Sequence, residues 1–325
     1  MLNIRKYRSG DEEGFHKLDR ELEEHPYNRR SISNYIWKFK GKNPFGKSVS
    51  YFSTNKKKII AHFGAIPLGW YIKNKYVLSG CSIAMMIKPE WQNKGLIKFV
   101  GDKVFQDLKM KKVKLVYGYP NLRAHDLHIK FWNYENLIKQ YTYILKTKST
   151  YTPSKFNAVE IKKFDKNYDI FWKKNKKNYK AILDRNSKFL NWRYFNRPDK
   201  KYYCFKIIDS KQSNLGYFVL KIYKYKNVKK IHIVDLFIKK LKTNDLISIC
   251  QTILNVIHKK KLNQSEISFW LNGDKNLVNA FKFFGFKKNS YRWMILKGID
   301  EKYFKAYKAE LKNPYFTMGD TLEIY

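Results

Sequence analysis

Hydrophobic and polar positions in the first 146 residues follow a pattern that predicts a mixed α/β unit. Apolar runs rich in β-branched and aromatic residues predict strands, and apolar positions three and four residues apart predict helices. Strands are expected at residues 3–8, 49–53, 59–72, 76–87, 113–119 and 137–146. Helices are expected at residues 11–24, 31–40, 95–110 and 122–131, and Lys73-Asn74-Lys75 is expected to form a hairpin turn. This order predicts an antiparallel meander and then a crossover helix that leads into a parallel strand.

The same order of elements follows a polar segment, residues 146–155, which contains Pro153 and has no periodicity. Strands are expected at residues 158–163, 202–208, 215–223, 230–237, 266–270 and 286–296. Helices are expected at residues 168–180, 187–195, 244–259 and 276–284. The second half therefore reads as a diverged copy of the first, and we expect two tandem domains at residues 1–148 and 156–325.

The length and the cysteine content narrow the class of protein. The chain has 325 residues and 44% hydrophobic residues, which is enough to form two buried cores. No run of about 18 uncharged apolar residues predicts a transmembrane helix, and residues 1–8 lack the apolar core of a signal peptide. The three cysteines, Cys81, Cys204 and Cys250, are widely spaced. We therefore expect neither a disulfide framework nor a metal site, and a cytoplasmic location.

The charge of the chain is strongly positive. Lys and Arg number 67 against 27 Asp and Glu, which gives a formal net charge of +40. Such a charge favours a polyanionic partner. However, Lys is spread along the whole chain, and Arg, which is the better residue for phosphate and base recognition, is scarce. The composition therefore favours small anionic ligands over a nucleic-acid surface.

The sequence at residues 85–97 joins the end of an apolar strand to the start of a helix. The strand ends at Ile87, and Gln92-Asn93-Lys94-Gly95 leads into the helix. Backbone N–H groups at a helix start lack intrahelical partners, and the helix dipole favours an anion there. Gly95 lets the backbone approach a ligand closely, and Lys94 adds positive charge. The segment therefore predicts a pyrophosphate site.

This segment resembles motif A of the GCN5-related N-acetyltransferases (GNAT family), written V-x-P-x-x-[RQ]-x-x-G-x-[GA]. Ile87, Pro89, Gln92 and Gly95 match the motif, whereas Ile97 stands where the family usually has Gly or Ala. The alternative is an ordinary strand–turn–helix. The resemblance implies that coenzyme A contacts this loop and one residue further along the chain, namely Ile87, Gln92, Asn93, Lys94, Gly95, Leu96, Ile97 and Asn121.

A second part of the resemblance lies downstream of the loop. Asn121, followed by Ala124 and a helix, matches the family residue whose side chain bonds the pantetheine arm, and His128 falls about where the family has its general-acid tyrosine. In the second half, residues 279–286 resemble the same closing motif, but Phe281 at the acid position cannot donate a proton. Residues 235–246 contain no Q-x-x-G and no glycine. The first domain is therefore expected to bind acyl-CoA.

The fold that this resemblance implies is α/β (α+β), with two tandem GNAT-like domains. Each would be a mixed, centrally splayed sheet flanked by helices. The second, degenerate domain would shape the acceptor site or stabilise the first.

Tandem GNAT chains of this length include N-acyltransferases of nucleotide-linked amino sugars, and this sequence is similar to the AntD type. The segments that suggest this similarity are His62, residues 80–83, residues 117–121, Trp192-Arg193-Tyr194 and Gly319-Asp320. The resemblance implies that an acyl group moves from acetyl-CoA, or another short acyl-CoA, to the amine of a nucleotide-diphospho-amino-deoxysugar. Direct attack in a ternary complex is expected.

Three residues are candidates for catalysis. The ordinary pKa of His62 suits a base, Ser82 could orient the amine, and His128 could protonate the departing thiolate. Each has a structural alternative: a buried core histidine, a strand hydroxyl bonded to the backbone, and a surface helix histidine. In the family a bulge near the end of the coenzyme strand, here near Ile87, frees a backbone N–H for the thioester oxygen. Water or the thiolate could then serve as the base.

Two other functions stay open. A FemABX-like aminoacyl-tRNA-dependent transferase would suit the positive charge but has no need of the coenzyme loop. A non-enzymatic nucleic-acid-binding protein would need a clustered basic face, whereas Lys is scattered here. We therefore expect acyl-CoA and a nucleotide amino sugar as partners, with neither nucleic acid nor a membrane span, and leave a homo-oligomer open.

Overall fold

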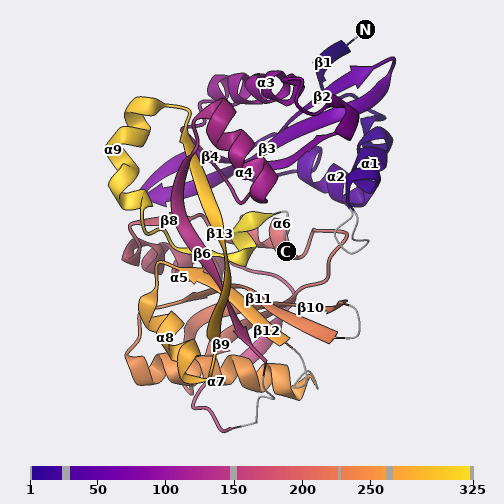
Figure 1. Cartoon of the computed structure of the whole chain (residues 1–325). Coiled ribbons are helices and arrows are strands. Elements are labelled where there is room, and N and C mark those ends of the chain that lie inside the picture. Colours follow the sequence, from indigo (N-terminus) through magenta and orange to yellow (C-terminus); the bar gives the residue numbers. More distant parts are fainter. Residues whose placement is uncertain (1, 24–29, 147–151, 226–227, 261–265, 323–325) are drawn as a thin grey trace.

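The computed structural model describes residues 2–23, 30–146, 152–225, 228–260 and 266–322, which form one long mixed sheet flanked by helices (Figure 1). The first half contributes β1 (Leu2–Lys6), α1 (Asp11–Leu22), α2 (Ile32–Phe39), β2 (Val49–Asn55), β3 (Lys58–Ile72), β4 (Lys75–Ile87), α3 (Leu96–Met110), β5 (Leu115–Gly118), α4 (Leu122–Trp132) and β6 (Glu135–Leu145). The second half contributes β7 (Asn157–Ile161), α5 (Lys166–Asn175), β8 (Ala181–Leu183), α6 (Ser187–Tyr194), β9 (Tyr203–Ile208), β10 (Asn214–Tyr225), β11 (Val228–Ile238), α7 (Thr243–Lys259), β12 (Glu266–Asn272), α8 (Lys275–Phe283), β13 (Lys287–Gly298), α9 (Glu301–Leu311), β14 (Phe316–Thr317) and the short helix η4 (Met318–Thr321).

The strands and helices predicted from the hydrophobic pattern are confirmed, with ends that move by a few residues. The hairpin turn is also present, because Lys73 and Asn74 both have the positive φ that the turn between β3 and β4 requires. The pattern did not predict β8, α9 or β14. These elements are short or lie outside the repeated order, so they carry little periodicity.

The two halves have the same strand pairing. β1 to β4 pair antiparallel and β4 pairs parallel with β5. In the second half β7, β9, β10 and β11 pair antiparallel, and β11 pairs parallel with β12. The duplicated order and the crossover into a parallel strand are therefore as predicted.

The last long strand of each half, β6 in the first and β13 in the second, lies in the place expected for the other. β13 lies between β5 and β6, and β6 lies between β13 and β12. Ile295 of β13 pairs with Gly118 of β5 on one side and Asn136 of β6 on the other. Each half therefore completes its sheet with a strand from the other half.

The predicted boundary at residues 146–155 falls partly outside the described residues, so the two domain ranges stay a prediction.

The helices of the first half cover opposite faces of the sheet (Figure 1). Phe15 of α1 and Tyr35 of α2 pack on the face where the His62 side chain lies. Phe105 of α3 and Trp132 of α4 pack on the other face against Phe63. Adjacent residues of β3 therefore point to different cores, as a strand covered on both faces requires.

Residues near the C-terminus fill the second half where its central strands separate. β11 and β12 pair only as far as Ile233 and Phe269, and β14 then pairs with β12. η4 follows, and a Cβ added at Gly319 would lie 2.2 Å from the Tyr194 hydroxyl, so the packing there is close. β14 and η4 thus occupy the space between the separated ends of β11 and β12.

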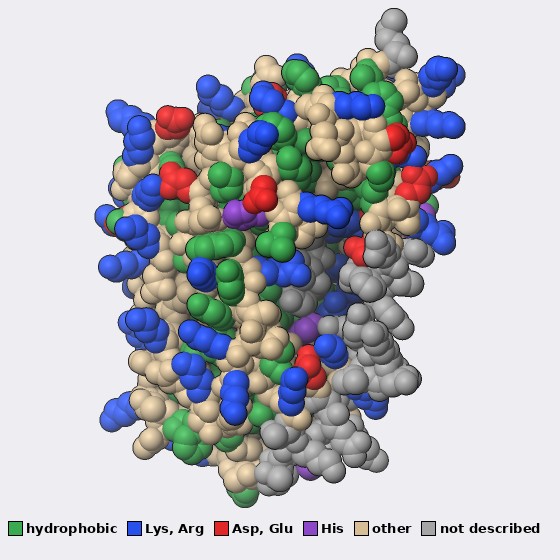
Figure 2. All heavy atoms as spheres, viewed as in Figure 1, with side chains coloured by type: hydrophobic (Ala, Val, Ile, Leu, Met, Phe, Trp, Pro, Cys, Tyr) green, Lys and Arg blue, Asp and Glu red, His purple; other side chains and the backbone are tan. Residues whose placement is uncertain are grey.

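Lys and Arg side chains are scattered over the visible surface rather than gathered over one element (Figure 2). In the part of the chain that the structure describes, no helix combines the length and apolarity needed to span a membrane. The charge of the chain is therefore not explained by a basic patch on this face.

Candidate active site

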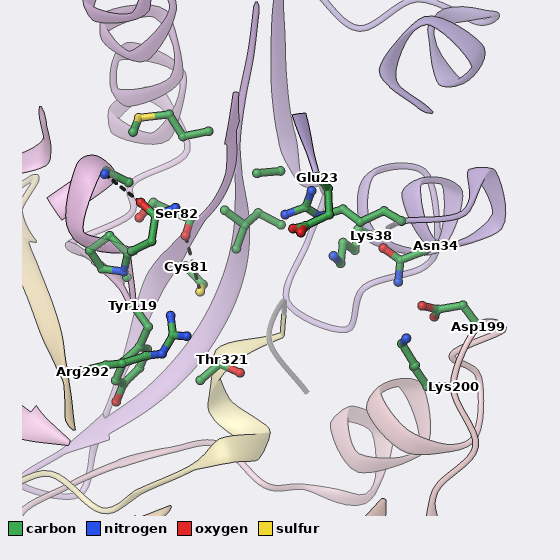
Figure 3. Close-up of a pocket in the computed structure, with 18 of the residues that line it drawn as sticks. Glu23, Asn34, Lys38, Cys81, Ser82, Tyr119, Asp199, Lys200, Arg292 and Thr321 are labelled. Carbon is green, nitrogen blue, oxygen red and sulfur yellow. Dashed lines mark hydrogen bonds between the residues drawn. The ribbon is translucent and has the colours of Figure 1, made fainter. Parts of the chain in front are cut away.

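A cavity of about 700 Å³ lies between the two halves (Figure 3). The first half lines it with the ends of β4 and β5, the start of α4 and part of α2. The second half lines it with residues from β10, β11, β13 and the segment after α6. A molecule in this cavity would therefore contact both halves.

The cavity begins where β4 and β5 separate. Their pairing ends at Cys81 and Tyr117, although β4 continues to Ile87. Beyond this point the cavity is lined by residues 82–85 of β4 and residues 118–121 at the end of β5. We call this place the β4–β5 opening. It exposes the edges of two neighbouring strands, whose backbone groups can bond an extended ligand.

A bulge in β4 lies beside the opening. His62 of β3 pairs with Met86, whereas Gly64 pairs with Ile83, so Ala84 and Met85 together oppose one residue of β3. Ala84 has φ 52°, an uncommon conformation for a residue with a side chain. Such bulges remove backbone groups from the ladder and direct them elsewhere. The family resemblance places this bulge near Ile87, and the structure has it at Ala84.

His62 holds the bulge from the buried side. The side chain is fully buried, Nδ1 lies 2.7 Å from the carbonyl oxygen of Ala84, and Nε2 lies 2.9 Å from Oγ of Ser50. The Tyr35 hydroxyl contacts the same Oγ at 2.9 Å. A trans peptide directs its C=O and N–H to opposite sides, so the N–H of Met85 points away from His62. His62 does not line the cavity, and its base role stays a prediction that this geometry does not favour.

For the acyl-CoA-dependent reaction that the sequence resemblance implies, we expect His62→Leu to lower kcat about tenfold to a hundredfold with little change in the acyl-CoA KM, because a loosened bulge misplaces the backbone N–H that faces the thioester oxygen. The pH profile of kcat should keep its shape, since a positioning residue does not exchange protons with substrate. Tyr35→Phe removes only the last hydroxyl of the hydrogen-bonded series Ala84–His62–Ser50–Tyr35. It should have a much smaller effect. Loss of a limb of the pH profile in His62→Leu would instead identify a base.

Ser82 and His128 both line the opening. The Ser82 hydroxyl donates to the carbonyl oxygen of Tyr117 at 3.2 Å, which leaves its oxygen lone pairs able to accept. His128 is 4% exposed, and its Nδ1 lies 2.6 Å from the carbonyl oxygen of Ala124. This contact places the proton on Nδ1, so Nε2 carries the lone pair. Burial lowers the pKa of His128 to about 4, although the Ala124 bond acts against it. Its expected acid role stays a prediction; the neutral ring is an acceptor.

The low pKa of His128 predicts an acid-sensitive fold. Between pH 6.5 and pH 4 the unfolded chain binds a proton at this histidine that the folded chain does not. Stability is therefore complete above this range and falls as the pH falls through it. His128→Phe should reduce the loss between pH 7 and pH 4 by about 2 to 3 kcal/mol, as measured by urea unfolding. An equal loss in both proteins would contradict the prediction.

The predicted pyrophosphate loop has an open backbone. Gly95 is the N-cap of α3 with φ 71°, and Asn93 has φ 60°. Within the described chain, no atom accepts a hydrogen bond from the backbone N–H groups of residues 93–97. The side chains of Leu96 and Ile97 are buried in the hydrophobic core. The larger side chain at position 97, where the family usually has Gly or Ala, therefore packs inside the domain. The loop can therefore offer several amides to an anion.

The structure brings together only some of the predicted site residues. Ser82, Asn121 and His128 line the cavity, whereas His62, Ile87 and residues 92–97 do not. Oδ1 of Asn121 accepts from the N–H of Ala124 at 2.9 Å as the N-cap of α4, which leaves its amide NH₂ for a ligand. The loop lies between the end of β4 and α3, so a long ligand would reach from the loop along β4 into the opening.

Basic side chains dominate the rest of the cavity wall. They come from both halves and are Arg30, Lys38, Arg197, Lys200, Lys201, Lys221, Lys230 and Arg292. The acidic lining residues are Glu23 and Asp199. Burial, with Lys200 and Arg197 nearby, lowers the pKa of Lys221 to about 7. The cavity therefore suits an anionic ligand. Sequence reasoning did not find these residues, since isolated lysines in a lysine-rich chain give no local signal.

Trp192 and Arg193 lie in the core rather than in the cavity. Trp192 stacks on Trp37 with ring centroids 4.4 Å apart. Arg193 is fully buried and donates to the carbonyl oxygen of Gly319 and to the Tyr202 hydroxyl. These residues join the second half to α2 and to the C-terminal segment.

Neither a protein-family model nor a curated protein matches this sequence. Solved structures do match. A conserved protein of unknown function from Enterococcus faecalis V583, described as a probable N-acyltransferase, gives a TM-score of 0.67 at 15% identity, over 94% of this chain and 74% of that one.

Two further structures match nearly the whole chain. A tandem GNAT protein from the clavulanic acid biosynthesis pathway gives a TM-score of 0.62 at 9% identity, over 92% of this chain and 99% of that one. Saccharomyces cerevisiae N-myristoyltransferase, solved with bound myristoyl-CoA, gives 0.64 at 11% identity, over 91% of this chain and 79% of that one. The chain therefore has the fold of the GCN5-related N-acetyltransferases, with two tandem GNAT-like halves.

Proposed function

We propose that this chain is an acyl-CoA-dependent N-acyltransferase whose acceptor is the amine of a nucleotide-linked amino-deoxysugar. The observation that carries the proposal is the β4–β5 opening with its bulge, which leads into a cavity with a basic wall. The opening suits an acyl-pantetheine arm, and the basic wall suits a diphosphate. The GNAT fold of the chain supports the same reaction class.

The residues of the first half fit coenzyme A. The open amides of residues 93–97 and Lys94 would hold the diphosphate, and the amide NH₂ of Asn121 would bond the pantetheine arm. Gly95 leaves open space where a Cβ would stand. In the second half the corresponding place is filled by β14 and η4. We therefore assign the coenzyme to the first half and the acceptor to the wall supplied by the second.

The reaction needs little side-chain chemistry. The amine nitrogen bonds the acyl carbon, the C–S bond breaks, and the amine proton passes to water or to the leaving thiolate. The bulge supplies a backbone N–H for the oxyanion. Ser82 and neutral His128 are acceptors that can orient the amine. Holding both substrates in one cavity supplies much of the rate.

A thiol-release assay with acetyl-CoA and a panel of nucleotide-diphospho-amino sugars tests the proposal. Thiol release should depend on the acceptor, and CoA should raise the melting temperature. Free amino sugars without the nucleotide serve as controls and should react poorly. No thiol release with any acceptor would leave the sugar assignment without support.

The charge of +40 favours one competing function, a transferase that uses aminoacyl-tRNA. A salt series separates the two. Tight RNA binding with a steep salt dependence, together with no CoA-induced shift, would favour the tRNA-dependent enzyme or a nucleic-acid-binding protein.

A further inference from the structure

One end of the cavity is unusually polar. Asn34 and Lys38 of α2 lie there with Asp199 and Lys200, which follow α6 (Figure 3). We call these four residues the polar end. In Figure 3 they lie across the cavity from Ser82 at the β4–β5 opening.

Asn34 is the residue that needs an explanation. It is 1% exposed, and neither Oδ1 nor Nδ2 makes a hydrogen bond of normal geometry, although the Asp199 carboxylate lies close enough to the amide to interact with it. A buried amide without hydrogen bonds of normal geometry lowers stability, and folded proteins keep few of them. The backbone of Asn34 is fixed, because its N–H donates to the capping hydroxyl of Ser31 at 3.1 Å. A rigidly placed amide at a cavity wall is therefore ready to bond a ligand.

Charged groups surround this amide. Lys38 and Lys200 bring positive charge to the polar end. Burial acts to raise the pKa of Asp199, but the Arg197 guanidinium, 2.9 Å away, together with the Asn34 amide and Lys200, outweighs it, and the pKa is about 2. Asp199 is thus an ionised acceptor over the whole useful pH range. The polar end therefore combines an amide, two cations and a carboxylate.

We propose that the polar end binds the nucleotide part of the acceptor, with Asn34 paired to the edge of the nucleobase and the lysines beside its phosphates. A primary amide presents a donor and an acceptor side by side, and a nucleobase edge presents the complementary pair. This inference rests on the proposed function, because the amine must reach the β4–β5 opening while the nucleotide occupies the other end. It assigns base recognition to α2 of the first half.

Titration calorimetry with uridine 5′-diphosphate and, separately, inorganic pyrophosphate tests this assignment on the full chain. Asn34→Leu keeps the size of the side chain and removes both hydrogen-bonding groups. It should weaken binding of uridine 5′-diphosphate about tenfold to a hundredfold and leave binding of pyrophosphate within about twofold. Lys200→Gln is the matched variant and should weaken both ligands.

A second measurement separates recognition from structure. The melting temperature of ligand-free Asn34→Leu should be unchanged or higher, because a buried amide without hydrogen bonds of normal geometry has been replaced by an apolar group. A lower melting temperature with equal loss of both ligands would show a structural role and overturn the assignment. Unchanged binding of uridine 5′-diphosphate would overturn it as well.

The two proposals fail in different ways. Asn34-dependent binding of uridine 5′-diphosphate without thiol release in any acyl-transfer assay would refute the acyltransferase and leave a nucleotide site. Thiol release with an unchanged acceptor KM in Asn34→Leu would refute only the role of Asn34.

Discussion

Gly95→Trp is expected to weaken CoA binding by about a hundredfold or more. Gly95 caps α3 with φ 71°, and a Cβ there would meet no atom within 4 Å. The indole would therefore project into the open space before the amides of residues 93–97, where the diphosphate is proposed to lie. Calorimetry with CoA, or the CoA-dependent rise in melting temperature, measures the effect.

Gly10→Trp is the matched control for this variant. Gly10 is also a helix N-cap, of α1, with φ 96° and no atom within 4 Å of an added Cβ. Both substitutions carry the strain of a left-handed conformation, but Gly10 caps α1 and lies outside the proposed coenzyme loop, which leads into α3. Gly10→Trp should lose comparable stability and keep CoA binding. Full CoA binding by the Gly95 variant would show that the loop is not the coenzyme site.

Arg185→Met is expected to lower the free energy of unfolding by about 3 to 5 kcal/mol. Arg185 is fully buried, with its guanidinium 2.6 Å from the carboxylate of Asp320 and 3.4 Å from that of Asp235. Removal of the cation leaves two buried carboxylates facing each other. Urea unfolding measures the loss, and proteolysis near η4 should become faster because Asp320 holds that segment.

A triple variant provides the control for Arg185. Arg185→Met with Asp235→Asn and Asp320→Asn removes all three charges together, which is often nearly neutral for a buried ion network. We expect it to recover most of the stability that Arg185→Met loses. Additive losses across the three sites would show that packing, rather than the uncompensated charge, explains the effect of the single substitution.

The predictable parts of this protein are those encoded by neighbours in the sequence. Helices and strands follow from local periodicity, and Gly95 at the start of a helix marks a loop that the structure confirms as open. The burial of His62 also had a signal. Residues 59–66 are apolar at nearly every position, which indicates a strand covered on both faces and therefore a core histidine.

The parts that escaped prediction depend on residues far apart in the chain. Asn34 and Asp199 meet at one cavity wall only because the two halves pack together. Arg185 and Asp320 give no motif, and their pairing follows from how β14 and η4 fill the second half. The exchange of β6 and β13 has no local trace, because either strand could pair with several apolar edges.

The exchange of β6 and β13 has a consequence for how the protein is made. The ribosome completes residues 2–146 long before β13 emerges. Until then, the edges of β5 and β6 that pair with β13 have no partner strand. Pairings of such long sequence separation form slowly. Chaperones that shield unpaired strands would therefore be needed most by the nascent first half of the chain. The sheet would be complete only after β13 has been synthesised.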